Sequence, residues 1–425
     1  MAGQFPREVK VAFDNAVAAL DDQLAMTQVS EIFQNDQTNM ARQGDQVWLP
    51  VPQIVASQSG SDATLDFKEP NELVVPAVLD QQEHVALILS DKEMRDQLRQ
   101  KNFGIAAAQK LSSVINVRAL RTLSLESTIF IKRPSTPTGF DDAAVVASRM
   151  DQLGIDPSDR IQVLAPSIYR GYASDLQKAS RSLDNETSVK ALRKADVGEL
   201  SSIEHLKLDY ARSLTANVTA GVQATTLAAG VNVYVPTTVS AAATGQLGNV
   251  DNRYQTMTFN GTAITAAMEG SAFTIANVFE VHPITKEVLP DLKTFRIKQF
   301  LTSTTAIVSP PMISAQNSEP AAVQYQNCSV STASATAGVT FLNTVTGPMN
   351  PFFRAGSLKI IPGRLQNETG SGAKVLYGET RNGIQMRMME FTDINTGKTK
   401  YRWDVFFGVN LPAPDQCGVI MFSQT

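Results

Sequence analysis

The first segment of the chain has the hydrophobic spacing of an amphipathic helix. Apolar residues recur three or four positions apart between Val9 and Leu24, and three aspartates, Asp14, Asp21 and Asp22, fall outside that stripe. Such a stripe buries one face of a helix and leaves the acidic positions in water. The pattern therefore predicts a helix within the first 30 residues.

A long polar connection separates the next two apolar segments. One segment begins at Val47 and the other covers residues 73–79, where Pro76 places the returning strand at a sheet edge. Two short strands joined in this way form a hairpin arm with a polar tip. The connection contains the charged residues Asp62, Asp66, Lys68, Glu69 and Glu72.

One long helix follows the arm. Ser90 and Glu93 have the spacing of a capping box, and apolar residues then keep a helical period until about Thr128. A helix of roughly 36 residues would be roughly 54 Å long, more than a compact domain of this size needs. After it, residues 142–153 and 167–179 predict helices and residues 160–164 a strand, which indicates an α/β region.

Charge is distributed unevenly along the chain. Residues 213–353 contain 11 charged side chains in 141 positions, whereas the other 284 positions contain 67, and residues 213–250 contain none. This change of composition marks a separate domain, and its Ala, Thr, Val and Gly content disfavours helix. We expect an all-β insert, a small barrel or sandwich. Its β-like runs are residues 254–259, 273–281, 294–300, 306–308 and 339–342.

The last part of the chain contains a hairpin signal. Residues 384–392 and 399–409 flank the turn sequence Asn395-Thr396-Gly397, and the second run alternates apolar and polar residues. This pattern predicts two paired strands with one buried face. The break in alternation at Met389 predicts a β-bulge in the first strand.

Composition excludes several classes of protein. With 425 residues, 43% of them apolar, the chain can bury a large core, and a net charge of -4 makes a dedicated nucleic-acid binder unlikely. No run of 18 or more strongly apolar residues predicts a membrane helix, and the start lacks a secretory apolar region, so we expect a soluble protein made in the cytoplasm. The cysteines, Cys328 and Cys417, are expected to be reduced.

No constellation of residues predicts catalysis, a metal site or a cofactor. Three histidines lie far apart, and none has ligand spacing. His205 stands close to Glu204 and Asp209, which leaves base catalysis open, but a partly exposed histidine at a helix end is the favoured interpretation. The expectation is a protein that is not an enzyme.

Four segments together resemble a known family. They are Gln46-Val47-Trp48-Leu49-Pro50-Val51, Val250-Asp251-Asn252-Arg253-Tyr254, residues 352–361 and Gly408-Val409-Asn410. Their order and spacing are similar to those of the major capsid (coat) proteins of short-tailed, double-stranded-DNA phages of enteric bacteria, a branch of the Hong Kong 97 fold with an inserted β-barrel. The resemblance runs nearly from end to end.

The resemblance implies an α+β fold of the Hong Kong 97 type and a division into named regions. They would be an N-terminal arm (1–46), an E-loop hairpin (47–88), a spine helix with peripheral domain (89–135), an axial A-domain (136–217), an inserted β-barrel I-domain (218–344), and a return through the A-domain and peripheral sheet (345–425).

The resemblance also implies partners. Such coat proteins form hexamers and pentamers of an icosahedral procapsid with an internal scaffolding protein, leave one vertex for a portal, package double-stranded DNA without sequence specificity and expand on maturation. No cofactor and no membrane is implied, and the expected location is the virion capsid. The alternative is a carbohydrate- or receptor-binding virion or surface protein that uses the β-insert.

Contact residues follow from the same resemblance. The candidates for contacts between subunits are Asp62, Asp66, Lys68, Glu69 and Glu72 in the arm and Thr244, Gly245, Gln246 and Asn249 in the insert. Asp14, Asp21 and Asp22 are candidates for contact with the scaffolding protein, although both acidic groups would also suit an ordinary solvated surface. Related proteins carry charges just before the Val-Asp-Asn-Arg segment, but residues 234–250 have none, so we expect weak salt sensitivity there.

Overall fold

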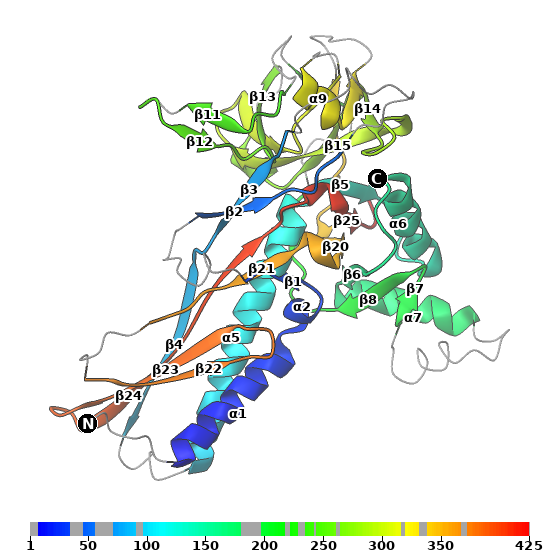
Figure 1. The fold of residues 1–425 in the computed structure, drawn as a ribbon. Coiled ribbons are helices and arrows are strands. Elements are labelled where there is room, and N and C mark those ends of the chain that lie inside the picture. The colour runs from blue at the N-terminus through cyan, green and yellow to red at the C-terminus, as the bar shows by residue number, and fades with distance from the viewer. Residues whose placement is uncertain are drawn as a thin grey trace, which may run out of the picture. The chain divides into compact units, whose positions relative to one another are not determined.

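The computed structural model describes residues 7–34, 46–55, 71–90, 97–179, 197–216, 222–227, 234–241, 244–260, 264–315, 319–330, 338–366 and 372–424 (Figure 1). The chain divides into two compact units. Unit 1 contains Met1–Trp48, Pro76–Arg121 and Leu358–Asn410, and unit 2 contains Leu49–Val75, Thr122–Ser357 and Leu411–Thr425. Three segments far apart in sequence therefore build each unit.

Unit 1 is built on a six-stranded sheet with the order β1-β21-β24-β23-β22, in which β4 also pairs with β24. Strand β24 is long enough to pair with β21 through its last residues and with β4 and β23 through the rest. The strands are β1 (Glu31–Ile32), β4 (Gln81–Ser90), β21 (Lys359–Pro362), β22 (Lys374–Glu379), β23 (Gln385–Asp393) and β24 (Lys398–Asn410).

Helices α1 (Arg7–Gln23) and α5 (Gln97–Glu126) cover one face of this sheet. The predicted stripe of α1, including Phe13, Leu20 and Leu24, is buried in the same cluster as Tyr401 and Trp403 of β24. Buried Asn116 of α5 accepts a hydrogen bond from the Met26 backbone N–H in the short helix α2 (Ala25–Gln28) and donates one to the Gln23 carbonyl. The predicted amphipathic helix and the one-sided hairpin are confirmed.

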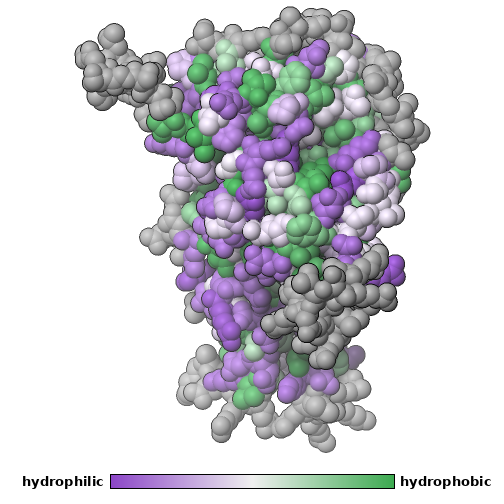
Figure 2. Space-filling view, turned by 90° about the vertical axis from the view of Figure 1, so that its right-hand side faces the viewer, coloured by the Kyte–Doolittle hydropathy of each residue, from purple (hydrophilic) through white to green (hydrophobic). Residues whose placement is uncertain are grey.

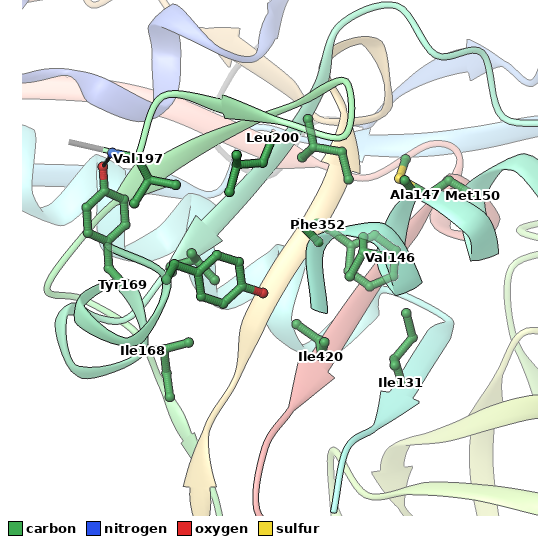
Figure 3. Packing of buried hydrophobic residues seen from close by; sticks show 14 of the residues in the cluster. Ile131, Val146, Ala147, Met150, Ile168, Tyr169, Val197, Leu200, Phe352 and Ile420 are labelled. Carbon is green, nitrogen blue, oxygen red and sulfur yellow. Dashed lines mark hydrogen bonds between the residues drawn. The ribbon is translucent and has the colours of Figure 1, made fainter. Parts of the chain in front are cut away.

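Unit 2 contains a second six-stranded sheet, with the order β5-β25-β20-β6-β8-β7. Residues from α6 (Phe140–Gln152) and α7 (Pro166–Ala179) pack against it, and Figure 3 shows Val146 and Ile168 in the same cluster as Phe352 and Ile420. The strands are β5 (Ile129–Lys132), β6 (Arg160–Leu164), β7 (Glu199–Leu200), β8 (Ile203–Lys207), β20 (Asn350–Arg354) and β25 (Cys417–Met421). The predicted α/β region is thus completed by the C-terminal segment.

The insert is a closed barrel. Its sheet has the order β15-β16-β13-β10-β18-β14-β17, and an additional pairing of β14 with β15 closes the ring. Phe259, Phe273, Phe295 and Phe341 fill its interior, with ring centroids 5.8 Å apart in three pairs. The strands are β10 (Val222–Leu227), β13 (Gln255–Asn260), β14 (Ala272–Val281), β15 (Val288–Phe300), β16 (Thr305–Ser309), β17 (Cys328–Val330) and β18 (Gly338–Phe341).

The remaining elements are short. The predicted arm begins as the two-stranded sheet of β2 (Gln46–Pro50) and β3 (Val74–Val78). Two further pairs are β9 (Ser213–Leu214) with β19 (Gly347–Pro348) and β11 (Val239–Ala241) with β12 (Leu247–Asn249). The other helical segments are α9 (Pro320–Gln324) and the single turns η1 (Ala266–Met268), η2 (Ala355–Ser357) and η3 (Pro414–Gln416).

Two local predictions have a different outcome. The β-bulge near Met389 is wrong, because β23 pairs with β24 without a register shift. The alternation is broken instead because the first part of β23 is covered on both faces: Met388 enters the core, and Arg387, on the opposite face, is buried against Asp404. The capping box at Ser90 cannot be assessed, since residues 91–96 lie outside the described part of the chain and Ser90 is the last residue of β4.

Candidate intersubunit surfaces

The β11–β12 hairpin carries four of the predicted contact residues. Thr244, Gly245, Gln246 and Asn249 are all exposed, and the two strands pair in register from Val239 with Asn249 to Ala241 with Leu247. Gly245 has a φ of 81°, which favours glycine in this tight connection. Leu247 is 72% exposed, so the hairpin offers an apolar side chain to solvent as well as uncharged polar groups.

The Val-Asp-Asn-Arg segment forms the base of this hairpin. Asn252, nearly buried, accepts hydrogen bonds from the Thr237 N–H at 3.1 Å and the Tyr234 hydroxyl at 2.9 Å and donates one to the Thr237 carbonyl at 2.9 Å. Arg253 forms an ion pair with Asp251 at 2.8 Å and donates to the Leu411 carbonyl. The Val-Asp-Asn-Arg segment, one of the four on which the resemblance rests, therefore fixes where the hairpin leaves the barrel (Figure 1).

The base of the arm is anchored to the insert. Leu73 packs in a cluster with Ile313 and Tyr325, and the Tyr325 hydroxyl donates to the Asn71 carbonyl at 2.6 Å. Glu72 accepts a hydrogen bond from the Gln53 side chain at 2.8 Å. The other predicted arm contacts, Asp62, Asp66, Lys68 and Glu69, lie outside the described residues.

The three aspartates of α1 do not share one environment. Asp14 and Asp22 are exposed, whereas Asp21 is partly buried and lies 3.4 Å from the Arg381 guanidinium. Asp21 thus already has a cationic partner in its own chain. The pair most available to another protein is Asp14 and Asp22.

A cationic face that the sequence analysis missed lies on the outer side of the unit 1 sheet. Because Tyr401 and Trp403 of β24 point into the core, the alternate residues Lys398, Lys400 and Arg402 point away from it. Lys400 lies 3.9 Å from Asp393 and Arg402 donates to Asp404 at 2.6 Å, so two of these cations already have an anionic partner in their own chain. Ile88 of β4 and Phe391 of β23, both register partners of Lys400, are 59% and 46% exposed. The alternation that predicted the buried face could also have identified this one.

A buried charge cluster was also missed. Glu280 of β14 is 1% exposed, and its carboxylate accepts from Lys293 of β15 at 2.8 Å and from Arg149 of α6. Arg149 also contacts Asp291 at 2.7 Å. Burial alone would lower the pKa of Lys293, but Glu280 beside it raises that pKa. Two cations and two carboxylates thus join the barrel to α6.

The expected environment of His205 is wrong. It lies in strand β8, not at a helix end, and is 4% exposed, with its ring 5.5 Å from the Tyr172 ring. Neither ring nitrogen has a hydrogen-bond partner among the described residues, so Glu204 and Asp209 do not pair with it. Burial lowers the pKa of His205 to about 4. The strand was missed because its sequence, Ile203-Glu204-His205-Leu206-Lys207, has a charged or ionisable residue at three of its five positions, unlike the mostly apolar β6.

The described residues contain neither a metal site nor a membrane-spanning helix. No group of three or more His, Cys, Asp or Glu side chains in the described ranges could hold a metal ion. None of the helices in these ranges is long and apolar enough to cross a membrane. On the face drawn in Figure 2, apolar residues are interspersed with polar ones.

Comparisons with known proteins identify the family. Residues 1–423 match the family model described as "P22 coat protein - gene protein 5". Among solved structures, the chain is similar to one from Mycobacterium phage Che8, with 9% identity over 93% of this chain and 90% of that one and a TM-score of 0.44. It is also similar to the capsid of cyanophage P-SCSP1u, with 10% identity over 93% and 87% and a TM-score of 0.44.

A further similarity is confined to part of the chain. The CUS-3 coat protein I-domain is 28% identical and covers 29% of this chain and 99% of that one, with a TM-score of 0.22. The assignment rests on the family match, which includes nearly every residue. The chain therefore belongs to the P22 coat protein family: it is a phage major capsid protein, with the α+β fold of the Hong Kong 97 type and the inserted β-barrel that the sequence predicted.

Proposed function

We propose that this capsid protein assembles with a scaffolding protein into hexamers and pentamers of an icosahedral procapsid. The procapsid has a portal at one vertex, packages double-stranded DNA in the bacterial host cytoplasm and expands on maturation. The observation that carries the proposal is the family match over residues 1–423. The net charge of -4 is consistent with loose, non-specific contact between shell and DNA.

The proposed regions keep the limits given by the sequence. Residues 1–46 are the arm, 47–88 the E-loop, 89–135 the spine helix and peripheral domain, 136–217 the A-domain, 218–344 the I-domain and 345–425 the return. The closed β14–β15 pairing supports a self-contained I-domain. The E-loop reaches over a neighbouring subunit in this proposal.

Opposite charges supply a partner for the E-loop. The five candidate contact residues of the loop, Asp62, Asp66, Lys68, Glu69 and Glu72, comprise four acids and one base. The outer face of the unit 1 sheet presents Lys398, Lys400 and Arg402 beside exposed apolar side chains, and Asp393 and Asp404 neutralise part of that positive charge. We assign the acidic loop of one copy to the cationic face of the next, because complementary charge sets register between repeated subunits.

The β11–β12 hairpin makes a different contact. Thr244, Gly245, Gln246 and Asn249 are exposed and uncharged, and Leu247 adds an apolar group. The two strands pair only with each other among the described residues, so the backbone groups along their outer edges are open to a second copy. This hairpin joins neighbouring capsomers through backbone and apolar contacts, which salt screens little.

The exposed carboxylates of α1 are assigned to the scaffolding protein. Asp14 and Asp22 would meet basic side chains of that partner, while Asp21 keeps Arg381 in place. A charge-reversing change at Asp14 or Asp22 is expected to weaken co-assembly more than the same change at an acid outside α1, such as Glu287. Co-sedimentation with scaffolding protein measures the difference.

The whole proposal is tested by sedimentation velocity and negative-stain electron microscopy on the protein alone and with a scaffolding protein. Closed shells with scaffolding protein, and aberrant sheets or shells without it, are the expected result. A monomer under both conditions, unchanged as concentration rises, would contradict the proposal. A ligand screen of residues 218–344 would then test the receptor-binding alternative.

A further inference from the structure

The largest fully buried side chain of the described residues is an arginine. Arg296 lies in β15 of the barrel and is 1% exposed. None of the hydrogen bonds or ion pairs recorded for it in the described structure involves a carboxylate. A buried cation without a counter-ion is costly, so its acceptors must compensate.

The acceptors of Nη1 lie at the C-terminal end of α5, and those of the other two nitrogens are the Gly270 carbonyl in the insert and the Met349 sulfur. Arg296 Nη1 donates to the Ser124 carbonyl at 2.5 Å and to the carbonyl and hydroxyl oxygens of Ser127 at 3.3 and 3.2 Å. Nη2 and Nε donate to the Gly270 carbonyl at 2.8 and 3.3 Å. The last carbonyls of a helix have no partner within it and carry the negative end of its dipole, which favours a cation there.

Neighbouring residues of β15 continue the same contact. The Thr294 hydroxyl donates to the Thr128 carbonyl at 2.9 Å, and Lys298 forms an ion pair with Glu126, the last residue of α5. Thr294, Arg296 and Lys298 alternate along the strand and therefore share one face. That face lies along the end of the helix from Ser124 to Thr128.

We propose that Arg296 caps α5 and that this strand face makes the barrel and the last turn of the helix one rigid joint. The insert then determines where the long helix ends. In any rearrangement of the subunit, the barrel and this turn move together, because separating them would leave Nη1 of the guanidinium and the carbonyl groups of Ser124, Ser127 and Thr128 without these partners. The joint exists in the single chain, so the proposal does not depend on shell assembly.

Hydrogen exchange followed by mass spectrometry on the full-length, unassembled chain tests the joint. Arg296→Lys keeps the charge but, with one nitrogen in place of a fork, cannot bond the helix-end oxygens and the Gly270 carbonyl in the same way. We expect amides in the last turn of α5 to exchange at least about tenfold faster in this variant, a change of about 1.4 kcal/mol in local opening. Arg387→Lys is the matched control, because Arg387 is also buried and hydrogen-bonded but contacts Asp404 in unit 1.

A second variant, Lys298→Met, tests the joint if the Arg296→Lys protein does not fold. Lys298 is about one-third exposed, so Lys298→Met should leave the chain folded and raise exchange in the same turn by a smaller factor. Unchanged protection of this turn in a folded Arg296→Lys protein would overturn the proposal. If Arg296→Lys does not fold, unchanged protection in Lys298→Met would overturn it.

Discussion

The outer hairpin β11–β12 and the inner strands β14 and β15 belong to the same insert and use charge in opposite ways. The hairpin is exposed along its described length and has no charged residue. In the two inner strands, Glu280, Lys293 and Arg296 are at most 5% exposed. Three charged residues of the insert are therefore buried against α5 and α6, whereas its projecting hairpin carries none.

This distribution separates two mechanical roles. A buried, hydrogen-bonded ion pair has one acceptable geometry, and losing one partner leaves a costly unpaired charge, so such contacts fix orientation within a subunit. An uncharged exposed strand edge makes contacts of moderate strength that salt does not disrupt. Fixed joints within the subunit and adjustable contacts between subunits would suit the proposed shell, which expands on maturation.

The largest expected effect comes from removing a buried carboxylate. Glu280→Gln leaves the Lys293 and Arg149 charges short of a partner, and we expect a loss of about 3 to 5 kcal/mol in the free energy of unfolding. Urea unfolding at neutral pH measures it. Glu287→Gln, at an exposed position of the same insert, should stay within about 0.5 kcal/mol of the wild type. Equal small effects in both variants would show that burial of charge does not distinguish the two regions.

A smaller effect concerns a buried ionisable group without a counter-charge. The pKa of His205 falls from 6.5 to about 4 on burial, so the unfolded chain binds a proton more readily than the folded one. Its contribution to stability is present above pH 6.5 and is lost as the pH falls toward 4, by about 2 kcal/mol between pH 7 and pH 5. His205→Gln should reduce the pH dependence by that amount in urea titrations. The same slope in wild type and variant would contradict the buried, neutral state.

The smallest expected effect on the subunit itself is at the hairpin. Leu247→Asp changes an exposed side chain, so the free energy of unfolding of the monomer should change by less than about 0.5 kcal/mol. Assembly should nevertheless weaken, because the new carboxylates bring like charges into the proposed contact. Light scattering during assembly gives the readout. Normal assembly of this variant would remove Leu247 from the contact.

The elements with a clear period were predictable from the sequence. The stripe of α1, the alternation at Tyr401 and Trp403, and strand β6 at residues 160–164 all appear as predicted. The first two contribute to the unit 1 core and β6 to the unit 2 core, so local pattern and tertiary environment agree in each. The closed barrel was one of two architectures that the composition allowed.

The sites were less predictable, because they depend on contacts between distant residues. Arg296 and Ser124 are 172 positions apart, and nothing in either neighbourhood indicates their contact. The missing charge in residues 234–250 was visible, but the burial of Glu280 and Lys293 was not, since the same residue types usually mark a surface. The sequence placed Asp21 in one group with Asp14 and Asp22. In the structure Asp21 differs from the other two because it pairs with Arg381, 360 positions later in the chain.

The central claim is that salt weakens the proposed contact between the acidic E-loop of one copy and the outer face of the unit 1 sheet of the next, and leaves the contact of the β11–β12 hairpin unchanged. The measurement is the fraction of protein in shells between about 0.1 M and about 1 M salt, a range over which the screening length falls from about 10 Å to about 3 Å. Two variants are compared with the wild type. The first combines Lys400→Gln and Arg402→Gln, and the second has residues 245–249 of the β11–β12 hairpin altered. The account predicts a salt dependence that the first variant reduces and the second leaves unchanged. A steep salt dependence that disappears when residues 245–249 are altered would contradict it.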